Sequence, residues 1–420
     1  MILISTIIDY VAGLWMGKLA SKKKRLPLLI LSLSVNLGLL FFFKYFNFFN
    51  EVLLDFASLF RIPFSPSLHK LLLPVGISFY TFQTLSYSID VYRGKLNPEK
   101  SFLKFAVFVS FFPQLVAGPI ERASNLIPQF SEEYSFDKER IINGLQLILW
   151  GFFKKIVIAD RIAIIVDSVY ANPHDFSGGY FALATYLFAI QIYCDFSGYS
   201  DIAIGTARIM GFDLMTNFKK PYFAISIKEF WSKWHISLST WFRDYVYIPL
   251  GGNRVSKFSW YRNIVITFVV SGIWHGANWT FIAWGFLHGF YLLIETVFSS
   301  KRIKLPSLIR GIITFHLILL AWVFFRSNSI GDAVYILKNT FVSWEIIDYS
   351  LLRITEQKYW FVIVATLIFI VVEAIDEKWN VSMKIRNLGR AVRPILYLGM
   401  LIVIMLFGVW DSSSFIYFQF

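Results

Sequence analysis

Two kinds of residue are scarce in this sequence of 420 residues. Charged side chains make up only 16% of it and cysteine occurs once, as Cys194, whereas a soluble globular protein is about a quarter charged. One cysteine excludes an internal disulfide framework and any metal site built from several thiolates. The scarcity of charge, together with a hydrophobic fraction of 56%, excludes an ordinary soluble domain and indicates a polytopic membrane protein.

Several signatures of known chemistry are also absent. The chain has no Walker loop, no GxSxG elbow and no CxxC pair, which excludes the nucleotide, hydrolase and thiol chemistries that these motifs support. Only six histidines occur, and the closest two, His275 and His288, are 13 positions apart. This spacing excludes the clustered ligands of a di-iron oxygenase, and no metal site is expected. No cleavable signal peptide is expected either, because the first apolar run contains Asp9 and lacks a basic start.

The formal charge of +13 would suit a nucleic-acid-binding protein. The basic residues cluster instead in short loops between apolar runs, which is the positive-inside pattern of membrane proteins. The loops at 18–25, 301–310 and 378–393 are strongly basic and are expected in the cytoplasm, whereas 327–358 is mixed in sign and is expected outside. No nucleic-acid partner is therefore expected.

Apolar runs of about membrane-spanning length recur along the whole chain. They are expected to be helices, because each segment in lipid must satisfy its own backbone amides. The runs cover residues 2–20, 26–49, 69–92, 102–118, 141–168, 179–210, 263–280, 281–299, 309–326, 359–375 and 394–410. No polar linker divides them, so we expect a single all-α transmembrane domain over 1–420 with about 10–11 transmembrane or re-entrant helices.

Residues 211–262 interrupt this pattern, because they are too polar for a simple span and yet rich in aromatic residues. Seven of the fourteen tryptophans fall between Trp231 and Trp284. From Trp231 onward, apolar and aromatic residues recur with helical spacing until Pro249 and Gly251–Gly252 end the pattern. The segment predicts a Trp-rich amphipathic helix, either at the membrane interface or re-entrant within the protein.

Polar groups at membrane depth are costly unless they are paired or face water, so they are the strongest pointers to function. If 254–262 is cytoplasmic, the helix that comes next carries His275 about 18–20 Å into a core about 30 Å thick. Gly272 and Gly276 allow a backbone or a ligand to approach closely. A histidine hydrogen-bonded between helices would also explain the position, although the glycines and the Asn278 amide favour a functional site.

Other buried polar positions have two interpretations each. His235 lies between two tryptophans in WSKWHISLSTW, which is typical of an interfacial aromatic belt as well as of a site. Asp195 and Asp201, in QIYCDFSGYSD, could orient a histidine, line an aqueous cavity, or pair with Arg208 or another buried cation. His288 lies in the GxxxG pattern GFLHG and is expected to support helix packing.

Two function classes remain open from the residues alone. One or two histidines can assist the transfer of an acyl group to a hydroxyl by acting as a base. A non-enzymatic transporter or channel would instead use Asp195 and Asp201, but it would not need the cluster of tryptophan and histidine residues.

Five motifs resemble, in order, the membrane-bound O-acyltransferase (MBOAT) family, and more narrowly its bacterial branch of alginate O-acetylation membrane proteins. They are LLPVGISFYTFQTLSYSIDVYRG, FFPQLVAGPIER, YCDFSGYSDIAIGTARIMGF, FWSKWHISLSTWFRDYVYIPLGGNR and SGIWHGANWTFIAWGFLHG. The closing FIYFQF is also typical of that branch. The resemblance runs from about residue 4 to 420, and relative to the family the chain looks shortened at its N-terminus.

The resemblance implies a ring of tilted helices around a thinned central region, in the inner membrane of a bacterial cell. A cytoplasmic donor side and an extracytoplasmic acceptor side would meet at that centre. It further implies that His275 of the WHGxxW motif is catalytic and that His235 is the second signature residue. The supporting residues are then expected to be Trp274, Asp195, Asn278 and His288.

The implied reaction is the O-acetylation of a cell-surface polysaccharide such as alginate. The acyl group is expected to be acetyl and to come from acetyl-CoA or another acyl thioester. No bound cofactor is expected. His275 would take the proton of the attacking hydroxyl or carry the acyl group itself. His235 would position or polarise the donor carbonyl, and Asn278 would donate to the oxyanion. An extracytoplasmic SGNH-type esterase-like partner is expected to finish the transfer. D-alanyl transfer to teichoic acid is the alternative within the family.

Overall fold

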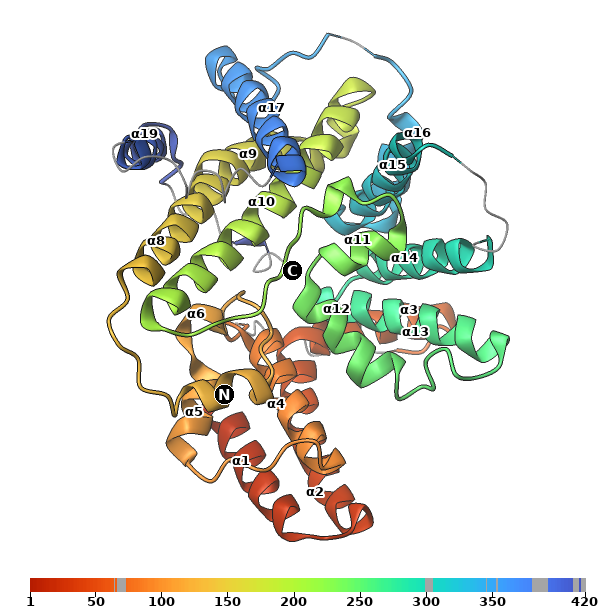
Figure 1. Ribbon diagram of the computed structural model, residues 1–420. Helices are drawn as coiled ribbons and strands as arrows, with labels where there is room; N and C mark the ends of the chain where they lie inside the picture. The colour runs from red at the N-terminus through yellow and green to blue at the C-terminus, as the bar shows by residue number, and fades with distance from the viewer. Residues whose placement is uncertain are drawn as a thin grey trace. The chain divides into compact units, whose positions relative to one another are not determined.

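The computed structural model describes the chain except for residues 64, 66–72, 299–304, 345, 353, 380–391, 411–414 and 417–420. The described residues contain helices and no strand (Figure 1), which confirms the all-α prediction for this part of the chain. They divide into two compact units, Met1–Arg140 with Ala207–Met215, and Ile141–Thr206 with Thr216–Phe420. The single domain expected over 1–420 stays a prediction.

The first unit is built from the N-terminal helices. Its elements are α1 (Ile2–Lys18), α2 (Lys22–Leu40), η1 (Phe41–Tyr45), α3 (Phe46–Leu59), α4 (Ile77–Arg93), α5 (Phe102–Ser110), α6 (Phe112–Leu115) and α7 (Ala123–Gln129). Helices α1, α2 and α4 pack against one another, and an apolar core with large aromatic side chains such as Phe105 and Phe108 fills the interior. The expected run 102–118 is broken into α5 and α6 at Phe111, just before Pro113, which suits the start of a helix and not its interior.

A fully buried carboxylate ties the three packed helices of this unit together. Asp9 of α1 accepts hydrogen bonds from Asn36 Nδ2 of α2 at 2.8 Å and from Ser88 Oγ of α4 at 3.0 Å, and Ser32 Oγ of α2 also donates to it. A carboxylate buried without a cation is tolerated only when several donors replace its water shell. Asp9 therefore specifies the relative position of α1, α2 and α4.

The second unit contains the remaining helices. They are α8 (Lys138–Phe152), η2 (Phe153–Ala159), α9 (Asp160–Ala171), η3 (Pro173–Asp175), α10 (Gly179–Met210), η4 (Pro221–Phe223), α11 (Ile227–Lys233), α12 (Ile236–Phe242), η5 (Arg243–Tyr247), α13 (Lys257–His275), α14 (Trp279–Phe298), α15 (Ser307–Arg326), α16 (Ile330–Asn339), α17 (Glu356–Trp379) and α19 (Val392–Phe407). The first residues of α8 and the last of α10 belong to the first unit.

Five helical stretches among the described residues are long and apolar enough to cross a membrane. They are Lys22–Leu59 in the first unit and Lys138–Ala171, Trp279–Phe298, Ser307–Arg326 and Glu356–Glu377 in the second. These stretches support the predicted multi-pass membrane protein. Residues 301–304 and 380–391 of the basic loops expected at 301–310 and 378–393, and most of the C-terminal SSSFIYFQF, lie outside the described residues.

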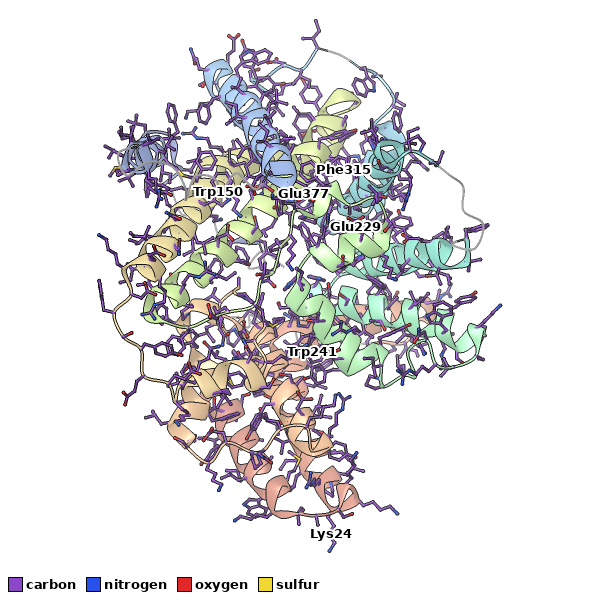
Figure 2. The ribbon with its side chains drawn as sticks, in the orientation of Figure 1. Lys24, Trp150, Glu229, Trp241, Phe315 and Glu377 are labelled. Atoms are coloured by element: carbon purple, nitrogen blue, oxygen red, sulfur yellow. The ribbon has the colours of Figure 1, made fainter. Side chains whose placement is uncertain are left out.

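The Trp-rich segment differs from the single helix that its spacing predicts. It forms two short helices, α11 and α12, which are separated at Trp234 and His235 because His235 adopts a left-handed backbone with φ of 42°. Trp234 and Trp241 are buried within the protein (Figure 2 labels Trp241 on α12). The segment therefore forms two short helices with buried tryptophans, and its placement at the interface or as a re-entrant segment stays a prediction.

Helices α13 and α14 form a tight pair with a corner at Gly276–Asn278, a few residues before the predicted break. At Gly272 the backbones come so close that an added Cβ would lie 2.3 Å from the carbonyl oxygen of Phe281 and 3.3 Å from Gly285 Cα. The predicted close approach at Gly272 is thus a backbone contact between helices rather than room for a ligand. This contact fixes the direction in which α14 leaves the corner.

The Asp9 network predicts a clear stability effect. Replacing Asp9 with Ala leaves the donors of Ser32, Asn36 and Ser88 without an acceptor, and the free energy of unfolding should fall by about 2–4 kcal/mol. Thermal unfolding of the purified protein in detergent would measure the change. Asp55→Ala, at an exposed carboxylate of α3, is the matched control and should leave the melting temperature unchanged. Equal melting temperatures for the two variants would refute a structural role for Asp9.

The α13–α14 contact yields a second prediction. In Gly272→Ala the new methyl group must push Phe281 away, and this overpacking should lower the free energy of unfolding by about 1–3 kcal/mol. Gly311→Ala in α15 is the control, because the nearest atom to its Cβ is 3.8 Å away, so the variant should be neutral or slightly stabilising. If Gly272→Ala melts no lower than Gly311→Ala, the contact does not limit stability.

Candidate functional site

Helix α13 carries His275 far from its own basic start. The helix begins at Lys257, where Ser256 Oγ accepts the Ser259 N–H at 3.3 Å, and it ends at His275. The 18 intervening steps correspond to about 27 Å, close to the thickness of a membrane core of about 30 Å. His275 therefore lies at the opposite end of α13 from its basic start, and it is only 3% exposed.

Aromatic rings from three helices hold the imidazole of His275. Its ring centroid is 4.9 Å from Trp274 of α13, 4.8 Å from Trp284 of α14 and 5.5 Å from Phe325 of α15, and all three contacts are edge-to-face. Such packing fixes the plane of a small ring as firmly as a hydrogen bond does. The position of His275 therefore depends on the α13–α14 corner and on α15 together.

His235 is fully buried at the start of α12 and lies beside Asn217. Its Nδ1 is 3.4 Å from Asn217 Oδ1, which also accepts the Ser237 hydroxyl at 2.6 Å. An amide oxygen can only accept, so this contact favours the tautomer with the ring proton on Nδ1 and the lone pair on Nε2. His235 lies outside the five candidate spans, and burial lowers its pKa to about 3. The ring is therefore neutral at pH 7, with Nε2 as a proton acceptor.

Trp274 brings the two sequence-predicted catalytic histidines into one cluster. Its ring centroid lies 6.4 Å from that of His235 and 4.9 Å from that of His275. The two histidines belong to different helices and are 40 positions apart in the chain. The fold thus places both beside one indole, as a shared site requires, although their catalytic roles stay predictions.

His288 supports the same cluster from α14. Its Nδ1 accepts a hydrogen bond from Trp231 Nε1 at 3.3 Å, which links α14 to α11. The ring of His288 is 5.0 Å from Trp284, and Trp284 in turn contacts His275. His288 is therefore connected to His275 through one tryptophan, in the supporting position that the GxxxG pattern predicts.

Asp195 is held by partners other than a histidine. Its Oδ1 lies 2.5 Å from Lys155 Nζ, and its Oδ2 accepts the backbone N–H of Ile416 at 2.8 Å. Lys155 also pairs with Asp160 at 2.8 Å. Among the described contacts, Asp195 thus joins α10 to η2 and to the C-terminal segment. These contacts favour a structural ion pair over the orienting of a histidine.

Asp201 has a buried counter-ion as well. Lys154 Nζ lies 2.7 Å from Asp201 Oδ2 and 2.8 Å from Ser197 Oγ. The cation that pairs with Asp201 is therefore Lys154 of η2 and not Arg208, the first partner that the sequence suggested. Each aspartate of QIYCDFSGYSD forms an ion pair with one of two adjacent lysines of η2. Neither is therefore an unpaired acidic group of the kind that the transporter interpretation would use.

Asn278 stabilises the corner between α13 and α14. Its Oδ1 accepts the Thr280 N–H at 2.9 Å, and its Nδ2 donates to the carbonyl oxygen of Asn328 at 2.9 Å. Both ends of the amide are thus used to cap α14 and to tie the corner to the end of α15. This arrangement explains the residue without an oxyanion role, which stays a prediction.

A cavity of about 580 Å³ runs along α13 towards this cluster. Its α13 wall extends from Trp260 to Ser271, which lies one helical turn before His275, and corresponds to about 16 Å of helix. Trp231, the hydrogen-bond donor to His288, lines the same cavity. Lys228 and Arg243 add positive charge to its wall. The cavity therefore extends from the first turn of α13 to Ser271, and His235 and His275 are not among the residues that line it.

Several residues of the site were not predicted from the sequence. Asn217 lies in an irregular loop without any motif of its own, and Phe325 lies in an apolar run like many others. In the sequence, Lys154 and Lys155 are two charged residues within the apolar run 141–168, and the sequence does not show what they pair with. A search for buried cations opposite the buried aspartates would have found the lysines, whereas only the fold reveals Asn217 and Phe325.

The chain matches the membrane-bound O-acyltransferase family over residues 98–327. It is 41% identical to the probable alginate O-acetylase AlgI of Pseudomonas aeruginosa, over 83% of this chain and 68% of that protein. It is 40% identical to the peptidoglycan O-acetyltransferase of Helicobacter pylori, over 74% and 64%. It is 33% identical to the teichoic acid D-alanyltransferase of Streptococcus thermophilus, over 54% and 58%. The three clustered histidines all lie within the matched residues.

Proposed function

Because the chain belongs to the membrane-bound O-acyltransferase family, we propose that it moves an acetyl group from a cytoplasmic thioester such as acetyl-CoA to a hydroxyl of a cell-surface polysaccharide. The chain is an integral membrane protein and an acyltransferase. The acetyl donor, the polymer that accepts the group and the residues that carry out the transfer are what we propose beyond this class.

The named relatives favour acetyl transfer to a polymer outside the cytoplasm. Proteins named alginate O-acetylase are about 40% identical to most of this chain, and a peptidoglycan O-acetyltransferase is as similar. The teichoic acid D-alanyltransferases match a smaller share of the chain at lower identity. D-alanyl transfer is therefore the second candidate. The resemblance to the alginate branch also supports an extracytoplasmic SGNH-type partner that would carry the acetyl group to the polymer.

The cavity along α13 suits the arm of an acyl thioester. It begins near the basic residues at the start of α13, and we propose that these residues face the cytoplasm. Lys228 and Arg243 in its wall can bind the phosphates that CoA and phosphopantetheine share. Its aromatic and aliphatic walls would enclose the rest of the arm. The thioester carbonyl would then arrive one turn from His275.

His275 and His235 can account for each proton transfer that the acyl transfer needs. His275 as a neutral imidazole accepts the proton of the attacking hydroxyl while the hydroxyl oxygen bonds to the thioester carbonyl carbon. The bond from that carbon to sulfur then breaks, and the leaving thiolate takes up the proton. His235 presents a lone pair at Nε2, so it suits the orientation of a hydroxyl by accepting its hydrogen bond. Polarising the thioester carbonyl would instead require a hydrogen-bond donor at Nε2 of His235.

This proposal rests on one observation above all: the cavity along α13 ends at Ser271, one helical turn from His275. His275→Gln keeps the size and polarity of the side chain but removes the base, so acetyl transfer should fall by at least about 100-fold. Acetate released by mild alkali from the cell envelope measures the transfer, and immunoblotting of the membrane fraction measures the amount of protein.

A surface histidine provides the control for this variant. His174 is largely exposed and its Nε2 lies 3.6 Å from Asp332, so His174→Gln should retain acetyl transfer. Unchanged acetate release in His275→Gln, at equal amounts of membrane protein, would refute the catalytic assignment. If mild alkali released D-alanine in place of acetate from the wild-type envelope, the donor would be a D-alanyl carrier and not an acetyl thioester.

Blocking the cavity tests the donor route separately. Thr267 lines the cavity midway along α13, and Thr267→Trp should raise the KM for acetyl-CoA at least about tenfold, which is about 1.4 kcal/mol of lost binding. Initial rates of acetyl transfer in inverted membrane vesicles would measure it. Val270→Trp, at an exposed position of the same helix, should leave the KM unchanged. The same KM for both variants would exclude this cavity as the donor route.

A further inference from the structure

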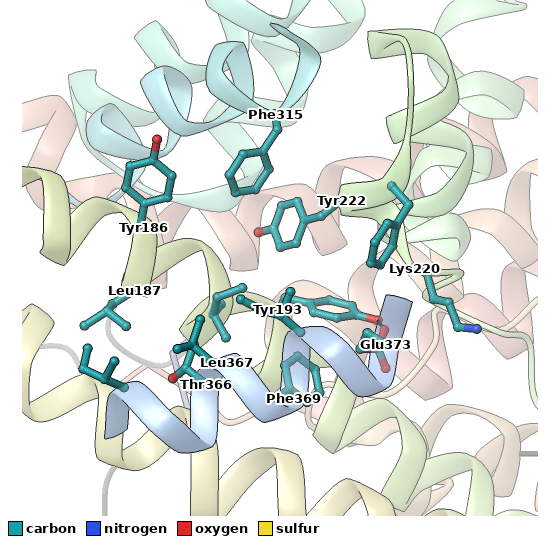
Figure 3. Close-up of a pocket in the computed structure, with 14 residues that line it drawn as sticks. Tyr186, Leu187, Tyr193, Lys220, Tyr222, Phe315, Thr366, Leu367, Phe369 and Glu373 are labelled. Atoms are coloured by element: carbon teal, nitrogen blue, oxygen red, sulfur yellow. Dashed lines mark hydrogen bonds between the residues drawn. The ribbon is translucent and has the colours of Figure 1, made fainter. Parts of the chain in front are cut away.

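A second pocket lies in the same unit, away from the α13 cavity. It has a volume of about 420 Å³ and is enclosed by α10, α15, α17 and the segment around Tyr222 (Figure 3). Its walls are almost entirely aliphatic and aromatic, and include Leu187, Phe315, Leu367 and Phe369. Nothing in the proposed acyl transfer uses this pocket.

The pocket faces the part of the protein that is exposed to lipid. Two of its walls, α15 and α17, are long and apolar enough to cross a membrane. Leu367 and Ile370 line the pocket and are nevertheless 57% and 38% exposed, so the pocket opens at the surface of α17. An opening on the apolar surface of a spanning helix meets acyl chains rather than water.

The length of the pocket corresponds to one leaflet. The wall on α17 runs from Ile363 to Glu373, ten residues along the helix. At 1.5 Å per residue this is about 15 Å, or half of a hydrocarbon core of about 30 Å. A single acyl chain of a membrane lipid spans the same distance.

Only one end of the pocket is charged. Lys220 and Glu373 lie together at one end and Leu187 at the other (Figure 3). Lys220 Nζ is 2.5 Å from Asp376 and 3.8 Å from Glu377, which is labelled on α17 in Figure 2. Lys233 Nζ also lies 3.4 Å from Glu377, so two ammonium groups and three carboxylates lie at the end where α17 approaches the basic segment expected in the cytoplasm. Groups of both charges therefore lie at this end of the pocket, which suits a head group with both a phosphate and an ammonium.

We propose that this pocket binds one acyl chain of a phosphatidylethanolamine molecule of the cytoplasmic leaflet, with the phosphate at Lys220 and the ammonium among the carboxylates of α17. The lipid would also brace the catalytic cluster. Tyr222 in the pocket wall accepts a hydrogen bond from Trp322 Nε1 at 3.2 Å, and Trp322 stacks on Trp284, the tryptophan that contacts His275.

The test fills the pocket with an indole. Full-length protein, purified in detergent and freed of lipid, is titrated with dioleoyl phosphatidylethanolamine and analysed by native mass spectrometry. The wild-type protein should bind one lipid with preference, and Ile370→Trp should weaken this binding at least about tenfold. Ile368→Trp is the matched control, because Ile368 is two positions away, 56% exposed and outside the pocket, and it should bind like the wild type.

Two further comparisons keep the proposal falsifiable. If Ile370→Trp does not fold, as judged by its melting temperature, Leu367→Trp places an indole at another exposed part of the pocket wall and should have the same effect. Dioleoyl phosphatidylglycerol, which lacks the ammonium, should bind the wild type more weakly, and Glu377→Gln should reduce that preference. Equal loss of binding in Ile368→Trp and Ile370→Trp, or equal affinity of the wild type for both lipids, would overturn the proposal.

Discussion

The close backbone contact between α13 and α14 is the constraint on which the functional part of this protein depends. Because Gly272 has no Cβ, the helix pair can meet at the carbonyl of Phe281 and turn within three residues at Gly276–Asn278. The corner places His275 against Trp284, and Trp284 packs on His288, which accepts the hydrogen bond of Trp231. A change in the spacing of the two helices would therefore move the whole aromatic cluster, from α13 to α11.

Buried polar groups cross-link each unit of the structure in addition to this contact. Asp9 joins three helices of the first unit through hydroxyl and amide donors, whereas Asp195 and Asp201 of the second unit are paired with adjacent lysines of η2. Where water is scarce, an unpaired polar group costs several kcal/mol, so each such pairing selects one arrangement of the helices. The pairings also explain why a chain with so few charges places some of them inside.

The second unit contains two cavities of different character. The α13 cavity has Lys228 and Arg243 in its wall and ends at Ser271, one helical turn from His275. The pocket beside α17 is apolar along one leaflet and charged at one end, and its wall reaches the cluster through Tyr222 and Trp322. The rings around His275 are thus the point at which a donor and the surrounding lipid would both affect the transfer.

Because low charge, long apolar runs and a polar residue at membrane depth have few physical explanations, the sequence alone predicted the class of the protein and most of its helices, and it singled out His275 as the catalytic candidate. It also determined the family, since the motifs are long and occur in order. Only the folded structure shows that α11 and α12 are separated at His235, that Asn217 lies beside the ring of His235, and that Asp195 pairs with Lys155. These features depend on contacts between distant segments, and the spacing of residues along one helix carries no information about which segment packs against it.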